Sequence, residues 1–270
     1  MFFTSRGRIY WLKANDVPAS ERQGKGKALV NILELRDETL SNVMAVKDFE
    51  KGYLMFATKK GIVKKIPLKD VSKPRSTGVR VINLPPDNSD SVVNVRTVED
   101  RQEVLMITKK GQAIRFSSDE VRAMGRASYG VTGADLAKND EIVALEALPK
   151  DGKTTILTTT VKGYGKRTEL EEYRKTSRGT KGVITLDTTD KTGDVLTALS
   201  VSGKDSIIAT TAKGVMIRVN MKDIRVMGRA TQGVRIVNLK EGDKVADVVK
   251  VPVAEDLPET PKENEQTTLK

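Results

Sequence analysis

The feature that most constrains the fold is a repeat with a period of about 51 residues. One set of glycines separates two short apolar runs and lies 54, 50, 52 and 51 residues apart, at Gly7, Gly61, Gly111, Gly163 and Gly214. A second set precedes another apolar run at spacings of 52, 52, 52 and 51, at Gly26, Gly78, Gly130, Gly182 and Gly233. Because two independent markers keep one period, the chain consists of five copies of one structural unit.

Each unit contains four short runs with the composition of β-strands. In the second unit, residues 53–58 and 62–66 flank Gly61, and residues 79–84 and 92–98 follow a polar loop. A short gap that contains glycine favours a tight hairpin, and the Val, Ile and Thr content suits pleated strands. We therefore predict an all-β fold, a β-pinwheel or propeller-like ring with five four-stranded blades over residues 1–251.

Other repeat folds explain this pattern less well. WD40 blades are shorter and carry a Trp-Asp pair, whereas Trp11 is followed by Leu12. Helical repeats require apolar residues at i, i+3, i+4 and i+7, and the segments between the glycines are too short for that pattern. An ordinary β-sandwich has no reason to keep one period over five units.

Residue types that are absent exclude several kinds of chemistry. The chain has no His and no Cys, so it has no Ser-His or Cys-His pair and no imidazole or thiolate zinc ligand. Asp151-Gly152-Lys153-Thr154 resembles the end of a P-loop, but Ala147 occupies the position of the first glycine. We expect a chain that is not an enzyme by itself and that needs no cofactor or metal.

The chain shows no signal for a membrane or for export. It contains no run of about 18 apolar residues and no secretory signal at its start, so we expect no membrane partner and a cytoplasmic location.

Residues 252–270 differ from the repeats. They contain three prolines, five acidic residues and two lysines, for a net charge of −3. Their low apolar content predicts a disordered acidic tail. The whole chain carries +11, so residues 1–251 carry +14. We expect the tail to compete with polyanions for the positive charge of residues 1–251.

Positive charge is concentrated in the loop that joins the second and third runs of each unit. The five loops contain fifteen cations and no acid in 38 positions, where about five acids would be expected by chance. These cations are Arg22, Lys25, Lys27, Lys73, Arg75, Arg80, Arg122, Arg126, Arg174, Lys175, Arg178, Lys181, Arg225, Arg229 and Arg235. Because the same loop is basic in every unit, we predict a rim of positive potential that binds a polyanion.

The loops favour duplex DNA over single strands. Only Tyr129 lies close to these cations, so there is no series of aromatic side chains on which unpaired bases could stack. Cations spread around a perimeter can offset the elastic cost of bending a duplex, which is on the order of 10 kcal/mol for a half-turn.

Several motifs resemble the C-terminal domain of the DNA gyrase A subunit. They are residues 2–13 (FFTSRGRIYWLK), 121–125 (VRAMG), 163–168 (GYGKRT), 180–184 (TKGVI) and 228–234 (GRATQGV). The resemblance implies a β-pinwheel that wraps duplex DNA around its perimeter and supports ATP-dependent negative supercoiling. It also implies that turn cations contribute to DNA binding: Lys59, Lys60, Lys64, Lys65, Lys109, Lys110, Arg115, Lys166, Arg167 and Arg218.

The resemblance also implies what surrounds such a domain. The family pinwheel usually has six blades, and its first blade carries a basic box, Gln-Arg-Arg-Gly-Gly-Lys-Gly. The first unit of this chain aligns with the family's second blade, so we expect the chain to begin after that box. The implied partners are duplex DNA and the gyrase catalytic core, which comprises the ATP-hydrolysing B subunit together with the N-terminal part of gyrase A. A DNA partner also implies a nucleoid-associated location. The alternatives are the C-terminal domain of the topoisomerase IV A subunit, or a free-standing, sequence-nonspecific DNA-binding protein.

Overall fold

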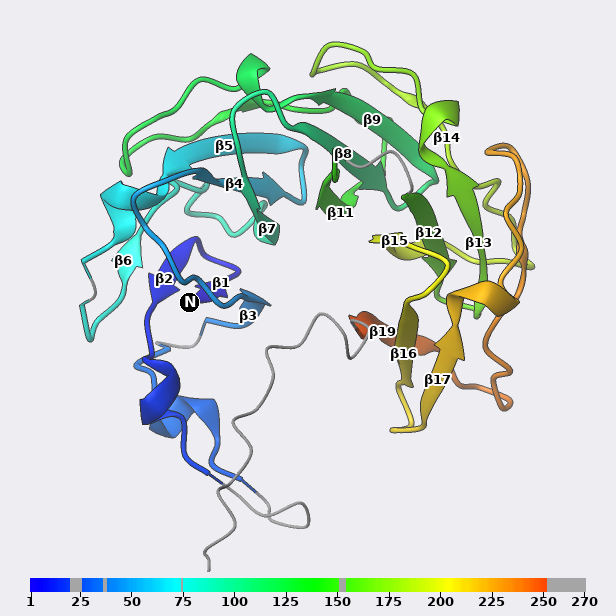
Figure 1. The fold of residues 1–270 in the computed structure, drawn as a ribbon, viewed down its shortest axis with the longest axis horizontal. Helices are drawn as coiled ribbons and strands as arrows, with labels where there is room; N and C mark the ends of the chain where they lie inside the picture. The colour runs from blue at the N-terminus through cyan, green and yellow to red at the C-terminus, as the bar shows by residue number, and fades with distance from the viewer. Residues whose placement is uncertain (20–25, 36–37, 74, 151–153, 252–270) are drawn as a thin grey trace, which may run out of the picture.

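Five small antiparallel sheets follow one another around an arc, with the first and the last at its two ends (Figure 1). The structure is a computed structural model that describes residues 1–19, 26–35, 38–73, 75–150 and 154–251. We call the sheets blades 1 to 5. The predicted all-β ring of five blades is confirmed. The predicted tail lies outside the described residues, and so does Asp151-Gly152-Lys153.

The blades have the following strands. Blade 1 contains β1 (Phe2–Thr4), β2 (Arg8–Tyr10), β3 (Leu40–Val43) and β6 (Val79–Arg80). Blade 2 contains β4 (Tyr53–Thr58), β5 (Ile62–Pro67), β7 (Val92–Val98) and β10 (Val131–Thr132). Blade 3 contains β8 (Glu103–Thr108), β9 (Gln112–Ser117), β11 (Ile142–Ala147) and β14 (Val183–Ile184). Blade 4 contains β12 (Thr155–Thr160), β13 (Tyr164–Glu169), β15 (Val195–Val201) and β18 (Val234–Arg235). Blade 5 contains β16 (Ser206–Thr211), β17 (Met216–Asn220) and β19 (Val245–Val251).

The outer strand of each four-stranded blade comes from the following unit. Val79 and Arg80 of the second unit pair with Ile9 and Arg8 in blade 1, and β10, β14 and β18 repeat this exchange. In blade 5, β17 has no outer strand among the described residues. The corresponding segment of the first unit forms the 3-10 helix η2 (Leu29–Asn31) instead of a strand.

The two sets of glycines have distinct roles. Gly111 closes a hairpin at φ 82°, and a Cβ there would lie 2.1 Å from the carbonyl oxygen of Leu186. Gly182 precedes β14 at φ 77°, and a Cβ there would lie 2.2 Å from the carbonyl oxygen of Ala113 in β9. Only glycine permits both the left-handed backbone and this close approach, so the second set fixes the seam between adjacent units.

The hydrophobic core lies between blades. Along β4, Leu54 and Phe56 pack toward blade 1, whereas Met55 and Ala57 pack toward blade 3. Phe56 meets Phe3 of blade 1 edge to face at 5.9 Å between ring centroids. Four such clusters join the five blades. Because β4 and β8 are buried on both faces, their sequences are continuous apolar runs rather than alternating ones.

Short 3-10 helices mark the turn from each unit's second strand toward its basic loop. They are η3 (Leu68–Val71), η4 (Ser118–Glu120), η5 (Leu170–Glu172) and η6 (Met221–Asp223), while η1 (Ala14–Asp16) lies in the first unit. No helix in the described part of the chain is long and apolar enough to cross a membrane.

Candidate nucleic-acid interface

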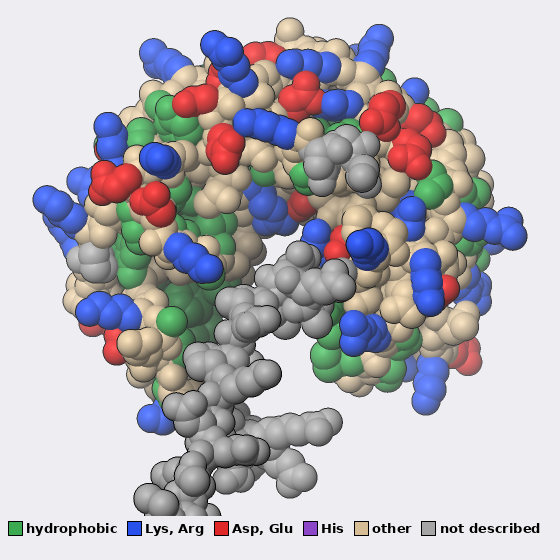
Figure 2. Space-filling model, viewed as in Figure 1, with side chains coloured by type: hydrophobic (Ala, Val, Ile, Leu, Met, Phe, Trp, Pro, Cys, Tyr) green, Lys and Arg blue, Asp and Glu red, His purple; other side chains and the backbone are tan. Residues whose placement is uncertain are grey.

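The basic loops lie at the outer ends of the blades. In units two to five, each loop runs from a 3-10 helix to an outer strand, which is β6, β10, β14 or β18. Each of these strands forms one edge of its sheet, and β3, β7, β11 or β15 forms the opposite edge. Figure 2 shows Lys and Arg side chains projecting around the outline of the molecule, with acidic side chains between some of them. The exchange of outer strands therefore places each basic loop at the rim, beside the preceding blade.

Nine of the fifteen predicted loop cations form what we call the perimeter set. Their side chains are exposed and have no hydrogen bond or ion pair with any described residue. They are Lys27, Lys73, Arg75, Arg80, Arg122, Arg126, Arg174, Lys181 and Arg225. Each is free to meet a phosphate without first giving up a partner in the described part of the protein.

Three members of the perimeter set occupy equivalent positions. Arg122, Arg174 and Arg225 each stand eight residues before the glycine that precedes an outer strand. All three are exposed. The repeat thus presents one arginine in the same place at three successive blades.

The remaining loop cations differ from this set. Arg22 and Lys25 lie outside the described residues. Arg178 and Arg229 are half-buried: Arg178 donates from Nε to the carbonyl of Glu120 at 3.1 Å and from Nη1 to the carbonyl of Thr132 at 2.8 Å, and Arg229 donates from Nη1 to the carbonyl of Ile184 at 3.1 Å. These two arginines stabilise the loops more than they extend from them.

Two other loop cations already have side-chain partners. Lys175 pairs with Glu103 at 3.3 Å. Arg235 donates to the hydroxyl of Tyr164 at 3.1 Å, and this hydrogen bond lowers the pKa of Tyr164. Lys191 lies over the same ring, 5.6 Å from its centroid, and was not predicted from the sequence because it is outside the basic loops. It adds a cation beside the β13–β18 edge.

The turn cations implied by the resemblance are mostly paired. Lys59 contacts Glu141 at 3.1 Å, and Asp194 contacts Lys109 at 3.7 Å and Lys110 at 3.0 Å. Lys60 and Arg218 are exposed, and Arg218 donates from Nε to the hydroxyl of Ser206 at 3.0 Å.

Three further turn cations join neighbouring blades. Lys65 donates to the carbonyl of Ser118 at 2.8 Å, Arg115 to that of Leu170 at 2.8 Å, and Arg167 to that of Met221 at 2.6 Å. Each acceptor is the first residue of the next unit's 3-10 helix. Lys65 is buried, and Arg115 and Arg167 are half-buried. These side chains hold the blades together and are not part of the exposed rim.

Lys64 and Lys166 are completely buried. Burial lowers the pKa of each to about 8. Their ammonium groups contact protein carbonyls, so they cannot touch a ligand at the rim. We therefore omit them, together with Lys65, from the surface that would meet DNA.

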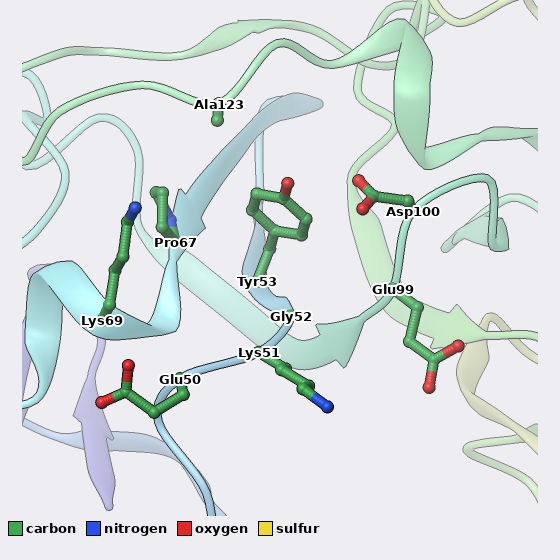
Figure 3. A pocket seen from close by; sticks show the side chains of 9 residues that line it. All are labelled: Glu50, Lys51, Gly52, Tyr53, Pro67, Lys69, Glu99, Asp100 and Ala123. Atoms are coloured by element: carbon green, nitrogen blue, oxygen red, sulfur yellow. The ribbon is translucent and has the colours of Figure 1, made fainter.

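Two hollows on the molecule are less suited to a polyanion than the rim. A hollow of about 590 Å³ places carboxylates beside lysines, and the neighbouring carboxylate of Asp100 raises the pKa of its Tyr53 (Figure 3). Its lining residues are Glu50, Lys51, Gly52, Tyr53, Pro67, Lys69, Glu99, Asp100 and Ala123. The other hollow, of about 720 Å³, lies on the inner side of the arc between β3, β7, β11, β15 and β19, which we call the hub. It contains Arg96 and Lys250, which are already paired with Glu146 and Asp205.

The comparisons with known proteins agree with the repeat. A family model described as "DNA gyrase C-terminal domain, beta-propeller" matches residues 1–47, 52–99, 102–149, 154–202 and 205–252. The DNA gyrase A subunit of Chlamydia muridarum is 43% identical over 266 residues, which is 96% of this chain and 31% of that protein. The same protein of Staphylococcus epidermidis is 40% identical over 254 residues, 93% of this chain and 28% of that protein. The chain thus spans about three tenths of the length of these relatives.

Solved structures show the same architecture. The C-terminal domain of DNA topoisomerase IV has a TM-score of 0.83 at 28% identity, covering 93% of this chain and 78% of that one. A DNA gyrase A C-terminal domain has a TM-score of 0.80 at 25% identity, covering 92% and 80%. Because the five matched segments follow the five repeat units over nearly all of residues 1–252, the chain belongs to the DNA gyrase C-terminal domain family.

Proposed function

We propose that the chain binds duplex DNA along its rim through the perimeter set and bends the duplex around the arc of blades. The observation that carries this proposal is that nine exposed cations, without partners among the described residues, recur in the same loop of successive units. Each can bind a phosphate and release the counterions condensed on it. Such contacts recognise the DNA backbone and carry no sequence information.

The arrangement favours bending over attachment at one point. A single patch holds a duplex at one position. Because the blades follow an arc (Figure 1), cations at successive blades would hold a duplex along a curved path. Bending a duplex through a half-turn costs on the order of 10 kcal/mol. Counterions released at six to ten phosphate contacts contribute toward that cost, and they make the affinity fall by about 10³–10⁵-fold between 50 and 200 mM salt.

The rim also favours a duplex over a single strand. Tyr129 is exposed in the loop that carries Arg126, and it is isolated from other exposed aromatic side chains among the described residues. Single-strand binding surfaces stack several successive bases on aromatic rings.

Within a larger protein, this domain would serve a type II topoisomerase of the gyrase kind. The bent DNA would be presented to a catalytic core that comprises the ATP-hydrolysing B subunit together with the N-terminal part of gyrase A. Such presentation would support negative supercoiling. The gyrase A relatives support this assignment. The likeness to a topoisomerase IV domain favours a second candidate, the corresponding domain of a topoisomerase IV A subunit.

Duplex binding at several salt concentrations tests the first part of the proposal. We expect a steep slope of log affinity against log salt, which becomes flatter by about 0.9 for each phosphate contact removed. The triple variant Arg122→Gln/Arg174→Gln/Arg225→Gln should flatten it by about 2.7 and weaken all sequences alike. Lys204→Gln, an exposed cation in the turn before β16, is the matched control. An unchanged slope in the triple variant would contradict the proposed interface.

Ligation of a nicked circle in the presence of the chain tests wrapping. A shift in linking number, which is absent in the triple variant, supports bending around the rim. Binding without any shift in linking number would contradict the proposed bending around the rim.

A further inference from the structure

Lys64 and Lys166 occupy a position that is apolar in the other units. This position lies three residues after the hairpin glycine, where the other units have Tyr10, Ile114 and Ile217. We call these five equivalent positions the column. Tyr10 and Ile114 are each only 1% exposed, so the column belongs to the core. Because blade 3 accepts isoleucine here, the fold does not require a lysine, and burying a charge needs a compensating set of contacts.

The ammonium of Lys64 contacts three carbonyl groups. Its Nζ donates to Val81 at 2.5 Å, Arg126 at 2.8 Å and Ser128 at 3.1 Å. The last two acceptors belong to the basic loop of the next unit, just before β10. The three donors of one ammonium are therefore all used, and two of them fix the rim loop that carries Arg122 and Arg126.

Lys166 makes the equivalent contacts at the junction of blades 4 and 5. Its Nζ donates to the carbonyls of Gly228 and Arg229 and to the hydroxyl of Thr231, the last at 3.0 Å. All three acceptors belong to the loop that carries Arg225, just before β18. Two buried lysines thus reach outward to two rim loops from beneath.

The contact is matched by the sequence of the loop. The loops that receive an ammonium read Met-Gly-Arg-Ala-Ser at 124–128 and Met-Gly-Arg-Ala-Thr at 227–231. The loop beside Ile114 reads Thr-Ser-Arg-Gly-Thr at 176–180 and is fixed by its own side chains, since Thr176 donates to the carbonyl of Arg115 at 3.3 Å. Lysine in the column and Met-Gly-Arg-Ala in the following loop therefore occur together twice.

We propose that Lys64 and Lys166 are positioning residues for DNA binding, whose ammonium groups hold the Met-Gly-Arg-Ala loops so that the neighbouring perimeter arginines are pre-ordered for phosphate. The inference rests on the proposed function. Charge-assisted hydrogen bonds are about twice as strong as neutral ones. A loop that is already ordered loses less conformational freedom on binding, so its arginines bind more tightly.

The protonation state supports this role. Burial lowers the pKa of Lys64 and Lys166 to about 8, so at neutral pH both remain mainly ammonium. Glu172 opposes the effect of burial on Lys166 and Arg229 adds to it. Burying an ammonium in the core carries a large desolvation cost, which its hydrogen bonds must offset. Most of the acceptors that offset it lie in the loop that the ammonium orders.

Hydrogen exchange of the free chain provides the first test. Lys64→Met should raise the amide exchange rate in residues 122–128 by about tenfold or more, because the loop loses at least one charge-assisted hydrogen bond. The exchange rate in residues 225–231 should not change. Lys166→Met should do the reverse, so each variant controls for the other. Thr231→Val removes one acceptor of Lys166 and also the hydrogen bond that the Thr231 hydroxyl donates to the carbonyl of Gly228 at 3.0 Å. It should raise exchange in 225–231 by a smaller factor than Lys166→Met, because the ammonium stays and keeps its two carbonyl acceptors. Unchanged exchange in both loops would overturn the proposal.

Duplex binding provides the second test and separates positioning from a general loss of structure. Lys64→Met should weaken binding about tenfold, against little change for the exposed control Lys204→Met. In a background of Arg122→Gln and Arg126→Gln, Lys64→Met should have no further effect, because it acts through those arginines. An equal loss in both backgrounds would overturn the proposal. If the unchanged chain does not bind duplex DNA, the proposed function fails, and the exchange result still decides whether the lysines order the loops.

Discussion

The ion pair at the hub offers a direct test of how the blades hold together. Glu146 on β11 accepts from Arg96 on β7, at 2.6 Å from Nη2 and 3.1 Å from Nε. Its other oxygen accepts from the backbone N–H of Ser200 on β15 at 3.1 Å. Arg96 also donates to the side chain of Asn42 on β3 at 3.2 Å. One pair therefore connects blades 1 to 4, and we predict that breaking it destabilises the whole arc.

The burial of the pair sets the expected magnitude. The side chain of Glu146 is 9% exposed and that of Arg96 is 26% exposed. Removing one partner of a buried pair costs about 3–5 kcal/mol because the other charge stays without compensation. We expect Arg96→Met to lower the free energy of unfolding by an amount in that range. Glu146→Leu should lower it by about 3 kcal/mol, since Arg96 keeps some water and Asn42.

A double-mutant cycle measures the interaction itself. Replacing both partners with apolar residues of similar size is often nearly neutral, so the double variant should lose less than either single variant. Urea unfolding of the four proteins, followed by circular dichroism, provides the four free energies. If the two single losses add to within about 0.5 kcal/mol in the double variant, the pair does not couple the blades and the reasoning fails.

Three further outcomes are expected. Burial lowers the pKa of Lys64 from 10.5 to about 8, so between these pH values the proton stays mainly on the unfolded chain, and the free energy of unfolding should rise with pH more than that of Lys64→Met does. Urea unfolding of both proteins at pH 8 and at pH 10.5 measures this rise, and an equal change in the two proteins would contradict the role of burial. Phe56→Ala opens a void between blades 1 and 2 and should cost about 3–5 kcal/mol in the same assay, against much less for Phe56→Leu. Gly111→Ala places a methyl group 2.1 Å from the carbonyl oxygen of Leu186, at a residue with a left-handed backbone, and should lower the free energy of unfolding by at least about 2 kcal/mol. A melting temperature equal to that of the unchanged chain would contradict this.

The sequence predicts the blades because the backbone needs glycine at fixed places. A hairpin at Gly111 and a seam at Gly182 both require a left-handed residue without a side chain, so the period appears directly in the sequence. The sequence does not indicate which blade a third run joins. Val79 and Arg80 have the same period whether they pair within their own unit or with β2, and only the tertiary structure decides.

Individual cations are harder to place than the loops that contain them. Lys64 resembles a surface residue because lysine is rarely buried, yet the column of Tyr10 and Ile114 marks its position as core. An alignment of the five units with one another would have revealed this. The pairing of Lys175 with Glu103 depends on which blades are neighbours, and no local pattern in the sequence contains that information.

The exchange of outer strands places the contacts that hold adjacent blades together beside the loops that we propose bind DNA. Each rim loop from the third unit onward follows a 3-10 helix held by a cation of the preceding blade, as η4 is held by Lys65, and ends in a strand of that blade. Next to this contact, the backbones of Lys65 and Ala123 form a parallel bridge, as do those of Arg115 and Lys175. A phosphate bound to Arg122 would therefore pull on two blades together. Because the loops cannot move independently of the seams, the angle between adjacent blades would set the path of the bound duplex.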